Sequence, residues 1–374
     1  MNITVERAAL LAALQRASRA VERRASIPIL SNILMRAQSG RVSLIATDLD
    51  IEIEDNLAAD CHEDGVAALP AQTLLDIVRK LPEGAQIKLE APAEAGTASL
   101  RAGRSRFKLQ TLSAADFPSL DQPDEGATFE LPGHALAGAL AHVAFAMSAE
   151  ETRYYLCGVY LHQSPQQPGH LRLVATDGHR LSLTEIAVDS LPDFSGVIVP
   201  RKAAAELERM AQAADKAPIA LQVSGAKLSA SFGKARLTTK LVDGTYPDYA
   251  RAIPQNNTRA ATLQAEDLLA AADRVNTISD AKAGSAIKFS FGDNKLDLDS
   301  TNQDTGSAHE EVEITYPGEE ISIGFNGRYV VDMLAATAKT GPLEITLTDP
   351  GSPAIFRRAE TTNAFCVLMP MRVS

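Results

Sequence analysis

Leu44-Ile45-Ala46-Thr47-Asp48 and Leu173-Val174-Ala175-Thr176-Asp177 are nearly the same stretch, and Leu298-Asp299-Ser300-Thr301-Asn302 is a third, weaker copy. Each copy has the pattern of an apolar strand that ends in an acidic or polar turn. The copies recur at intervals of about 125 to 130 residues, which is the size of a whole domain rather than of a solenoid repeat. The sequence therefore predicts three similar domains in tandem.

Each third also contains two strand segments that run directly into amphipathic helices. In the first helix, Leu10 and Leu14 are spaced so that they share one helical face. The first strand–helix pairs are 3–5 into 6–18, 129–131 into 133–148 and 261–263 into 265–279, and the second are 68–70 into 71–81, 198–200 into 201–211 and 323–325 into 326–338. Segments with β-branched residues, such as 41–45 and 343–347, predict further strands. Because two helices can cover one face of two antiparallel sheets, we expect an α+β fold in each domain.

Length and composition fit a multidomain protein without disulfides. The chain has 374 residues, of which 45% are hydrophobic and 22% charged, and this suits two to four domains. Its cysteines, Cys61, Cys157 and Cys366, fall one in each third and lack the paired spacing of a zinc site. An odd and dispersed set of cysteines indicates a reducing compartment. No basic leader is visible, and no apolar run approaches the roughly 20 residues of a membrane span, so we expect a cytoplasmic protein.

Seven short stretches are spread over the whole chain: 26–30, 103–107, 153–156, 175–181, 240–244, 247–249 and 369–372. Together with the three repeats and the length, they resemble one family, the bacterial sliding clamp or β subunit of DNA polymerase III. The resemblance implies three tandem DNA-clamp domains, at residues 1–125, 128–254 and 258–374, that form a half-ring. Two such chains would join head to tail as a homodimeric ring of six domains around duplex DNA. No cofactor, metal or catalysis is implied.

The charge distribution agrees with such a ring. Net charge is −11, which argues against indiscriminate binding to nucleic acid. The six expected helices with their flanking residues nevertheless carry +4, which leaves −15 on the rest of the chain. A ring that slides needs weak, sequence-blind attraction to phosphate and no reading of the bases. A modest positive excess on repeated helices fits topological linkage better than tight adhesion.

The resemblance also implies a hydrophobic pocket, near the carboxy-terminal end, that receives short peptides. Its residues would be Tyr155, Leu156, Thr176, Gly178, His179, Arg180, Leu181, Pro247, Arg251, Val367, Met369, Pro370, Met371 and Arg372. The composition suits this role, because the unbranched side chains of Met369 and Met371 can repack around different partners. Gly178 has no side chain to obstruct a peptide backbone, and the arginines can donate hydrogen bonds to peptide carbonyl or carboxylate groups.

Two observations leave the pocket open to other interpretations. Four of its apolar residues could simply be core: Leu156, Leu181, Val367 and Met369. In addition, Ala252 stands where a larger branched residue is common in the family, and the chain ends in Val373-Ser374 rather than in leucine. These departures leave the depth of the pocket and its peptide preference undecided. The sequence also does not decide whether Cys157, next to the pocket stretch, is reactive.

Basic residues on or near the expected helices are candidate phosphate contacts. The DNA-binding set is Arg24, Arg79, Lys80, Arg104, Arg106, Tyr154, Arg201, Lys202 and Arg209. For each cation the alternative is a solvated surface charge. A closed ring also needs a seam between the first domain of one chain and the third domain of the next. For this seam we expect Phe107 and Leu109, on an edge strand, to face the region of Ile278, because pairing would protect an exposed edge; ordinary core packing is the alternative.

The expected partners are a second copy of the chain, double-stranded DNA of any sequence, the polymerase III core, clamp-loader subunits, and other polymerases and repair proteins with clamp-binding peptides. No membrane partner is expected. A metal-dependent nuclease is the main alternative, because Asp177 and His179 are close in sequence and Asp48 occupies the matching turn. Against it, the third copy has Asn302 there, and the sequence lacks a ligand cluster, a phosphate-binding glycine loop and a nucleophile elbow. A peptide-binding scaffold without DNA is a further alternative.

Overall fold

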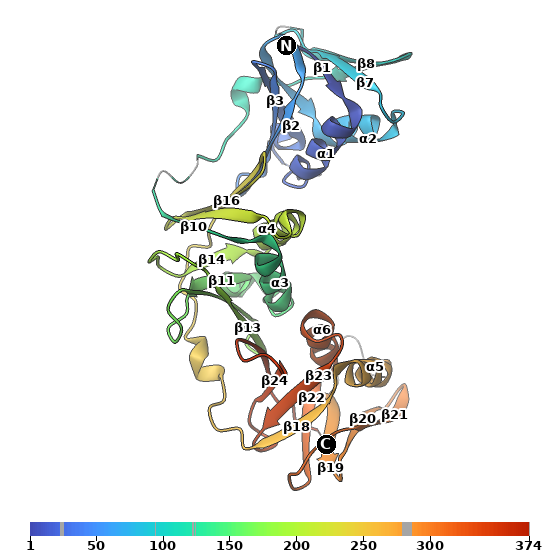
Figure 1. Cartoon of the computed structure of the whole chain (residues 1–374). Coiled ribbons are helices and arrows are strands. Elements are labelled where there is room, and N and C mark those ends of the chain that lie inside the picture. Colours follow the sequence, from blue (N-terminus) through green and yellow to red (C-terminus); the bar gives the residue numbers. More distant parts are fainter. Residues whose placement is uncertain (23–25, 94, 122, 124, 279–285, 374) are drawn as a thin grey trace. The chain divides into compact units, whose positions relative to one another are not determined.

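A computed structural model describes residues 1–374 apart from 23–25, 94, 122, 124, 279–285 and 374 (Figure 1). The first third contains β1 (Asn2–Glu6), α1 (Arg7–Ala17), η1 (Pro28–Ser31), β2 (Asn32–Gln38), β3 (Arg41–Thr47), β4 (Ile51–Ala58), β5 (Asp60–Glu63), β6 (Gly65–Pro70), α2 (Ala71–Lys80), β7 (Gln86–Glu90), β8 (Thr97–Ala102), β9 (Ser105–Gln110) and η2 (Ala114–Asp116).

The middle third has the same order of elements apart from the short strand β5 of the first third. It contains β10 (Ala127–Pro132), α3 (Gly133–Ala144), η3 (Glu151–Leu156), β11 (Gly158–Gln163), β12 (His170–Thr176), β13 (Arg180–Ala187), β14 (Val197–Pro200), α4 (Arg201–Ala214), β15 (Pro218–Val223), β16 (Lys227–Phe232), β17 (Ala235–Lys240) and η4 (Tyr249–Ala252).

The last third completes the repeat with β18 (Arg259–Gln264), α5 (Ala265–Asn276), β19 (Ala286–Gly292), β20 (Lys295–Asn302), β21 (Gly306–Glu313), β22 (Ile321–Asn326), α6 (Gly327–Thr337), β23 (Pro342–Leu347), β24 (Ala354–Arg358) and β25 (Ala364–Leu368). The three copies of the opening stretch lie on β3, β12 and β20. Each of the six expected helices is present, so the predicted α+β fold of two helices and antiparallel sheets per repeat is confirmed.

The strands form four antiparallel sheets, and two of these sheets run across repeats. Their orders are β5-β1-β7-β8-β9, β10-β15-β16-β17-β4-β3-β2-β6, β14-β11-β12-β13-β25-β24-β23-β18 and β21-β20-β19-β22. In the second sheet β17 of the middle third pairs with β4 of the first, and in the third sheet β13 pairs with β25 of the last third. Main-chain hydrogen bonds therefore join each repeat to the next.

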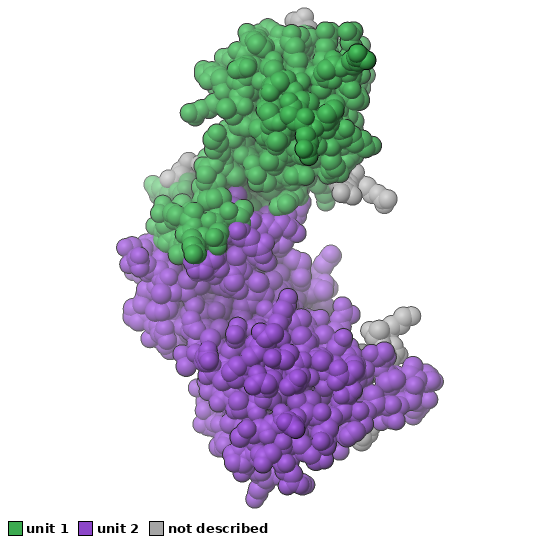
Figure 2. All heavy atoms as spheres, turned by 45° about the vertical axis from the view of Figure 1, so that its right-hand side comes forward, with its two compact units in different colours: residues 1–133, 213–241 green, residues 134–212, 242–374 purple. Residues whose placement is uncertain are grey.

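This pairing explains why the compact units do not coincide with the repeats. One unit comprises residues 1–133 and 213–241, and the other comprises 134–212 and 242–374 (Figure 2). The middle third contributes four strands to an eight-stranded sheet in each unit. The domain limits given above follow the repeats, and they stay a prediction.

Side-chain caps and buried faces account for the helices. The Glu6 carboxylate accepts a hydrogen bond from the Ala9 N–H at the start of α1, and Asn326 accepts one from the Tyr329 N–H in α6. In the last third α5 and α6 pack on a core with Phe289, Phe291 and Phe325, which are almost fully buried. The faces of the two helices in this core are Leu268, Ala271, Ala272 and Val275, and Val330, Met333 and Leu334.

Three helix ends differ from the prediction. The helix expected over 133–148 ends at Ala144, after which the chain tightens into turns in which the N–H of Ala146 bonds to the Val143 carbonyl. Two later carbonyl groups, of Met147 and Ser148, accept hydrogen bonds from Arg201 instead of from a further helical turn. Helix α4 continues to Ala214, beyond the expected end at residue 211. Helix α5, expected over 265–279, ends at Asn276, and residue 279 itself lies outside the described residues. No helix in the described part of the chain is long and apolar enough to cross a membrane.

The pairing of β13 with β25 is in contact with α3. Ser182 of β13 lies opposite Cys366 of β25, and its hydroxyl donates to the main-chain carbonyl of His142 in α3 at 2.7 Å. Burial lowers the pKa of the His142 imidazole to about 4, so this ring is neutral in the folded chain at neutral pH. Burial likewise raises the pKa of the Cys366 thiol to about 12, which keeps it protonated.

We predict that His142 makes the fold sensitive to mild acid. Because its folded pKa lies below the ordinary value of 6.5, the unfolded chain binds more protons between pH 6.5 and about 4. The stability that the neutral ring supports is complete above pH 6.5 and is lost as the pH falls, by at most about 1.4 kcal/mol per pH unit. Urea-unfolding midpoints of the wild type and His142→Gln between pH 7.5 and 4.5 should show a shallower decline in the variant. The exposed His62→Gln is the control, and equal slopes for wild type and His142→Gln would contradict the assignment.

Candidate functional site

The turn between β12 and β13 is held by its own side chains. The Thr176 hydroxyl accepts from the Gly178 N–H at 3.1 Å, and one Asp177 oxygen accepts from the N–H groups of His179 and Arg180 at 2.9 and 3.0 Å. Gly178 has φ of +91°, a left-handed conformation that favours glycine. The turn is a rigid Asx-type structure in which Asp177 is a structural acceptor.

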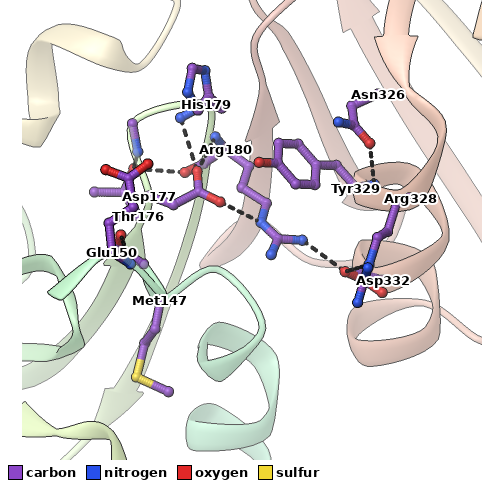
Figure 3. Close-up of polar contacts among 12 residues, drawn as sticks. Met147, Glu150, Thr176, Asp177, His179, Arg180, Asn326, Arg328, Tyr329 and Asp332 are labelled. Carbon is purple, nitrogen blue, oxygen red and sulfur yellow. Dashed lines mark hydrogen bonds and ion pairs between the residues drawn. The ribbon is translucent and has the colours of Figure 1, made fainter. Parts of the chain in front are cut away.

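Arg180 connects this turn to α6 of the last third (Figure 3). Its guanidinium donates to Asp177 at 3.0 Å and to Asp332 at 3.2 Å. The same group lies over the Tyr329 ring, 4.2 Å from the centroid, and 5.3 Å from that of Phe145. Two carboxylates and two aromatic rings therefore fix the position of a single cation.

Sequence reasoning named Arg180 but missed Tyr329, Asp332 and Phe145. Tyr329 and Asp332 are three residues apart on α6, a spacing that puts both on one face of a helix. The spacing is visible in the sequence, but no sequence feature indicated that this face of α6 contacts a turn about 150 residues earlier.

The carboxy-terminal segment 369–372 lies beside the same turn. The Met369 N–H donates to the His179 carbonyl at 2.9 Å, and the Met371 N–H donates to the Gly324 carbonyl at 2.7 Å. A Cβ placed on Gly324 would lie only 2.5 Å from the Met371 carbonyl oxygen, so glycine is required for this close approach. The segment is thus anchored at one point to the middle third and at another to the last third.

Apolar residues under this surface form a buried cluster. Leu156, Leu181 and Val367 are only 2 to 4% exposed and pack with Val174 and Ile198, so the interpretation as core residues is right for these three. Met369 differs, because 37% of it is exposed. The predicted peptide-site residues therefore comprise a buried apolar cluster and one exposed apolar side chain, that of Met369.

Aromatic residues hold the segment after β17 next to this cluster. The Tyr246 ring stacks on Tyr160, with centroids 4.6 Å apart and planes 5° apart. The Tyr249 hydroxyl accepts from Arg172 at 3.1 Å and lies 2.9 Å from His162 Nε2. Burial raises the pKa of the Tyr246 and Tyr249 phenols, so both stay neutral. This anchoring positions the residues that follow each tyrosine.

The remaining predicted peptide-site residues lie in the same unit. Pro247 and Arg251 are exposed, and Arg251 forms an ion pair with Asp248 at 2.8 Å. Tyr155, Pro370 and Met371 are half-buried, and His179 and Arg372 are exposed.

Of the residues that depart from the family pattern, Ala252 and Val373 are half-buried. Cys157, also half-buried, directs its thiol at the carbonyl groups of Glu150 and Arg153, 3.3 and 3.7 Å away.

The predicted DNA contacts are spread over several elements. Arg79 and Lys80 are exposed at the end of α2, with Arg79 paired to Asp76 at 3.2 Å, and Tyr154 is exposed in η3. At α4, Lys202 is exposed, Arg209 pairs with Glu206, and Arg201 donates to the carbonyls after α3. Arg104 and Arg106 are exposed on the β8–β9 hairpin. Arg24 lies outside the described residues.

Two sheet edges are relevant to the predicted seam. β9 is the edge strand of the first sheet, with Phe107 36% exposed, whereas Leu109 is buried in its own sheet. β21 is an edge strand of the fourth sheet. Ile278 is half-buried near that sheet, and its carbonyl accepts from the Thr305 hydroxyl at 2.6 Å.

The residues that suggested a nuclease do not form a metal site. Both oxygens of Asp177 are already engaged, one by two backbone N–H groups and the other by Arg180. In the ranges that the structure describes, no three His, Cys, Asp or Glu side chains gather closely enough to hold a metal ion. The groups around Arg180 are instead apolar side chains and arginine donors, which are the types of group that commonly bind peptides.

Comparisons with known proteins cover the chain almost completely. Protein-family models match residues 1–121 (DNA polymerase III beta subunit, N-terminal domain), 130–248 (central domain) and 250–372 (C-terminal domain). The "Beta sliding clamp" of Caulobacter vibrioides is 43% identical over 377 residues, and that of Escherichia coli K12 is 38% identical over 375, each with 100% of both chains covered. A crystal structure of the Bartonella birtlesii sliding clamp bound to griselimycin has a TM-score of 0.95 at 39% identity, with 100% of both chains covered.

We predict that Gly324→Ala displaces the carboxy-terminal segment. The added methyl group would clash with the Met371 carbonyl, at an overpacking cost of about 1 to 3 kcal/mol. Hydrogen-exchange mass spectrometry should show faster exchange over residues 369–372 and an otherwise unchanged pattern. Ser322→Ala, on the same strand, is the control. Unaltered exchange of 369–372 in Gly324→Ala would show that the segment does not depend on this contact.

Proposed function

The chain belongs to the family of the bacterial DNA polymerase III β subunit, the β sliding clamp, and from this premise we propose how its residues hold DNA, a second chain and partner peptides. Sliding clamps are processivity factors: a ring-shaped homodimer encircles duplex DNA, slides along it and tethers the replicative polymerase. The full-length match in all three repeats carries this assignment. We assign the chain no catalytic activity, and we place it in the cytoplasm, where replication proteins act.

We assign the weak attraction to DNA to cations of α2 and α4, with Tyr154. Arg79 and Lys80 end α2, and Lys202 begins α4 beside Arg201. Arg201 and Arg209 already have intramolecular partners, so each can make only a limited contact with phosphate. Such partly compensated cations suit a ring that must move along DNA, because tight neutralisation of phosphate would oppose sliding.

For the seam we propose edge-to-edge pairing of β9 with β21 of a second chain. Arg106 and Lys108 are exposed on β9, whereas β21 carries Glu310, Glu311 and Glu313. Opposite charges on two unpaired strand edges favour association and disfavour pairing of either edge with itself. We therefore assign Arg106 to the seam rather than to DNA, and Phe107 supplies apolar surface there.

For partner proteins we propose a docking surface around Met369 and Arg180. An apolar peptide side chain would pack on the floor of Leu156, Leu181 and Val367, and Met369 would cover it. The occupants we expect are clamp-binding peptides of the polymerase III core, of clamp-loader subunits, and of other polymerases and repair proteins. Griselimycin, which is bound to the Bartonella birtlesii sliding clamp in its crystal structure, serves as a chemical probe for this surface.

The ring is tested by retention on DNA together with solution mass. Protein loaded on nicked circular plasmid should stay bound in about 0.5 M salt, which screens phosphate contacts, and should be released when the plasmid is cut. Light scattering should give the mass of two chains.

Arg106→Glu with Lys108→Glu should give the mass of one chain and no retention, because both edges would then be acidic. Arg41→Glu with Lys234→Glu, on exposed residues away from β9, is the control. Equal retention on circular and linear DNA would refute encirclement.

The docking surface is tested with Met369→Ala combined with Met371→Ala. Loss of the thioether side chains should weaken griselimycin binding at least tenfold, about 1.4 kcal/mol, in isothermal titration calorimetry, while the mass of two chains persists. Met210→Ala in α4 is the matched control. Wild-type affinity in the double variant would remove Met369 and Met371 from the site.

A further inference from the structure

We propose that the first third of the chain carries a second copy of the peptide site, which is kept closed by the side chain of Leu49. This inference rests on the function proposed above for the middle third, since it concerns the corresponding position in another repeat. It assigns the chain one open peptide site and one latent site of the same kind.

The turn after β3 repeats three side-chain hydrogen bonds of the turn after β12. The Leu49 N–H donates to the Thr47 hydroxyl at 3.0 Å. One Asp48 oxygen accepts from the N–H groups of Asp50 and Ile51 at 3.0 and 2.8 Å. These are the bonds that the Thr-Asp pair makes in the middle third, with nearly the same lengths. The two turns therefore present their third residue, Leu49 or Gly178, in the same way.

The apolar floor under the turn is also repeated. Strand register sets the correspondence, because Asn32 lies opposite Pro70 just as Gly158 lies opposite Pro200. On this basis Ile29, Leu30 and Ile45 of the first third correspond to Tyr155, Leu156 and Val174 of the middle third. Each set belongs to one apolar cluster, which the Phe117-Pro118 or the Tyr246-Pro247 segment borders. The first third thus has the floor of a peptide site.

What differs is the residue above the floor. Leu49 has φ of +82° and Gly178 has φ of +91°, but only the leucine carries a side chain, and that side chain packs against the cluster of Ile29, Leu30 and Ile45. A bulky residue is strained in this conformation and persists there when packing offsets the strain. Gly178 is exposed, and a Cβ placed on it would meet only the end of the Arg153 side chain, at 2.9 Å. Leu49 therefore occupies, within its own chain, the position that Gly178 leaves to a ligand.

A second difference closes the site further. The Lys240 N–H donates to the Asp50 carbonyl at 2.8 Å, as the Met369 N–H donates to the His179 carbonyl at 2.9 Å. Lys240 thus occupies, beside the turn of the first third, the position that Met369 occupies beside the turn of the middle third. Its ammonium group pairs with the Asp50 carboxylate at 3.3 Å, so a salt bridge replaces the exposed thioether. An opened first-third site would bind an apolar ligand more weakly until this lysine is also replaced.

The number of binding sites per chain tests the inference, with griselimycin as the probe in isothermal titration calorimetry. Wild type should bind one molecule per chain. Leu49→Gly should bind two, the second at least tenfold more weakly, and addition of Lys240→Met should strengthen that second event. Gly178→Leu should bind none, since the introduced side chain would cover the floor in the manner of Leu49. Leu49→Gly combined with Gly178→Leu should bind one.

Circular dichroism melting curves show which variants are folded. One site per chain in folded Leu49→Gly, with or without Lys240→Met, would overturn the latent site. Should Leu49→Gly not fold, Gly178→Leu still decides, because wild-type binding by that variant would show that leucine at this turn position does not close a site. The middle-third site itself is judged separately, by Met369→Ala with Met371→Ala. Failure of the proposed function and failure of this inference are therefore distinguishable.

Discussion

Main-chain hydrogen bonding between strands of neighbouring repeats is the constraint on which the rest of this structure depends. β13 pairs with β25, and β4 pairs with β17, so edges that would otherwise expose unpaired N–H and C=O groups are closed within the chain. Because the side-chain period of a strand is two residues, each pairing also determines which residues face the apolar cluster. The pairing of β13 with β25 in turn brings Met369 beside the turn at 176–180.

The turns after β3 and β12 share a pattern of hydrogen bonds from main-chain N–H groups and differ in the side chains that surround it. Thr47 and Thr176 receive the same hydrogen bond from the residue two positions later. The surfaces above these turns differ because Leu49 covers an apolar cluster where Gly178 exposes the backbone. The hydrogen bonds that shape the turn are therefore common to both copies, whereas the residue at the third position of the turn is leucine in one copy and glycine in the other.

The charged groups of this chain limit its attraction for DNA phosphate as much as they provide it. Arg180 is held by Asp177 and Asp332, and Arg209 pairs with a glutamate on its own helix. These ion pairs reduce the positive charge that the two arginines can offer to an outside anion. A net charge of −11 with a positive excess on the helices agrees with a protein that keeps its hold on DNA by closure of the ring rather than by adhesion.

The sequence by itself determined the threefold repeat, the type and order of its strands and helices, the Thr-Asp turn and the family, since these depend on local periodicity and turn chemistry. It also named Arg180, Gly178 and Met369, although it could not tell an exposed Met369 from a buried Val367. Tertiary structure alone decided the early end of α3, the approach of Tyr329 and Asp332 to Arg180, and the packing of Leu49. The physical reason is that these features need contacts between residues far apart in sequence, and such contacts exist only once strand pairing has set the register.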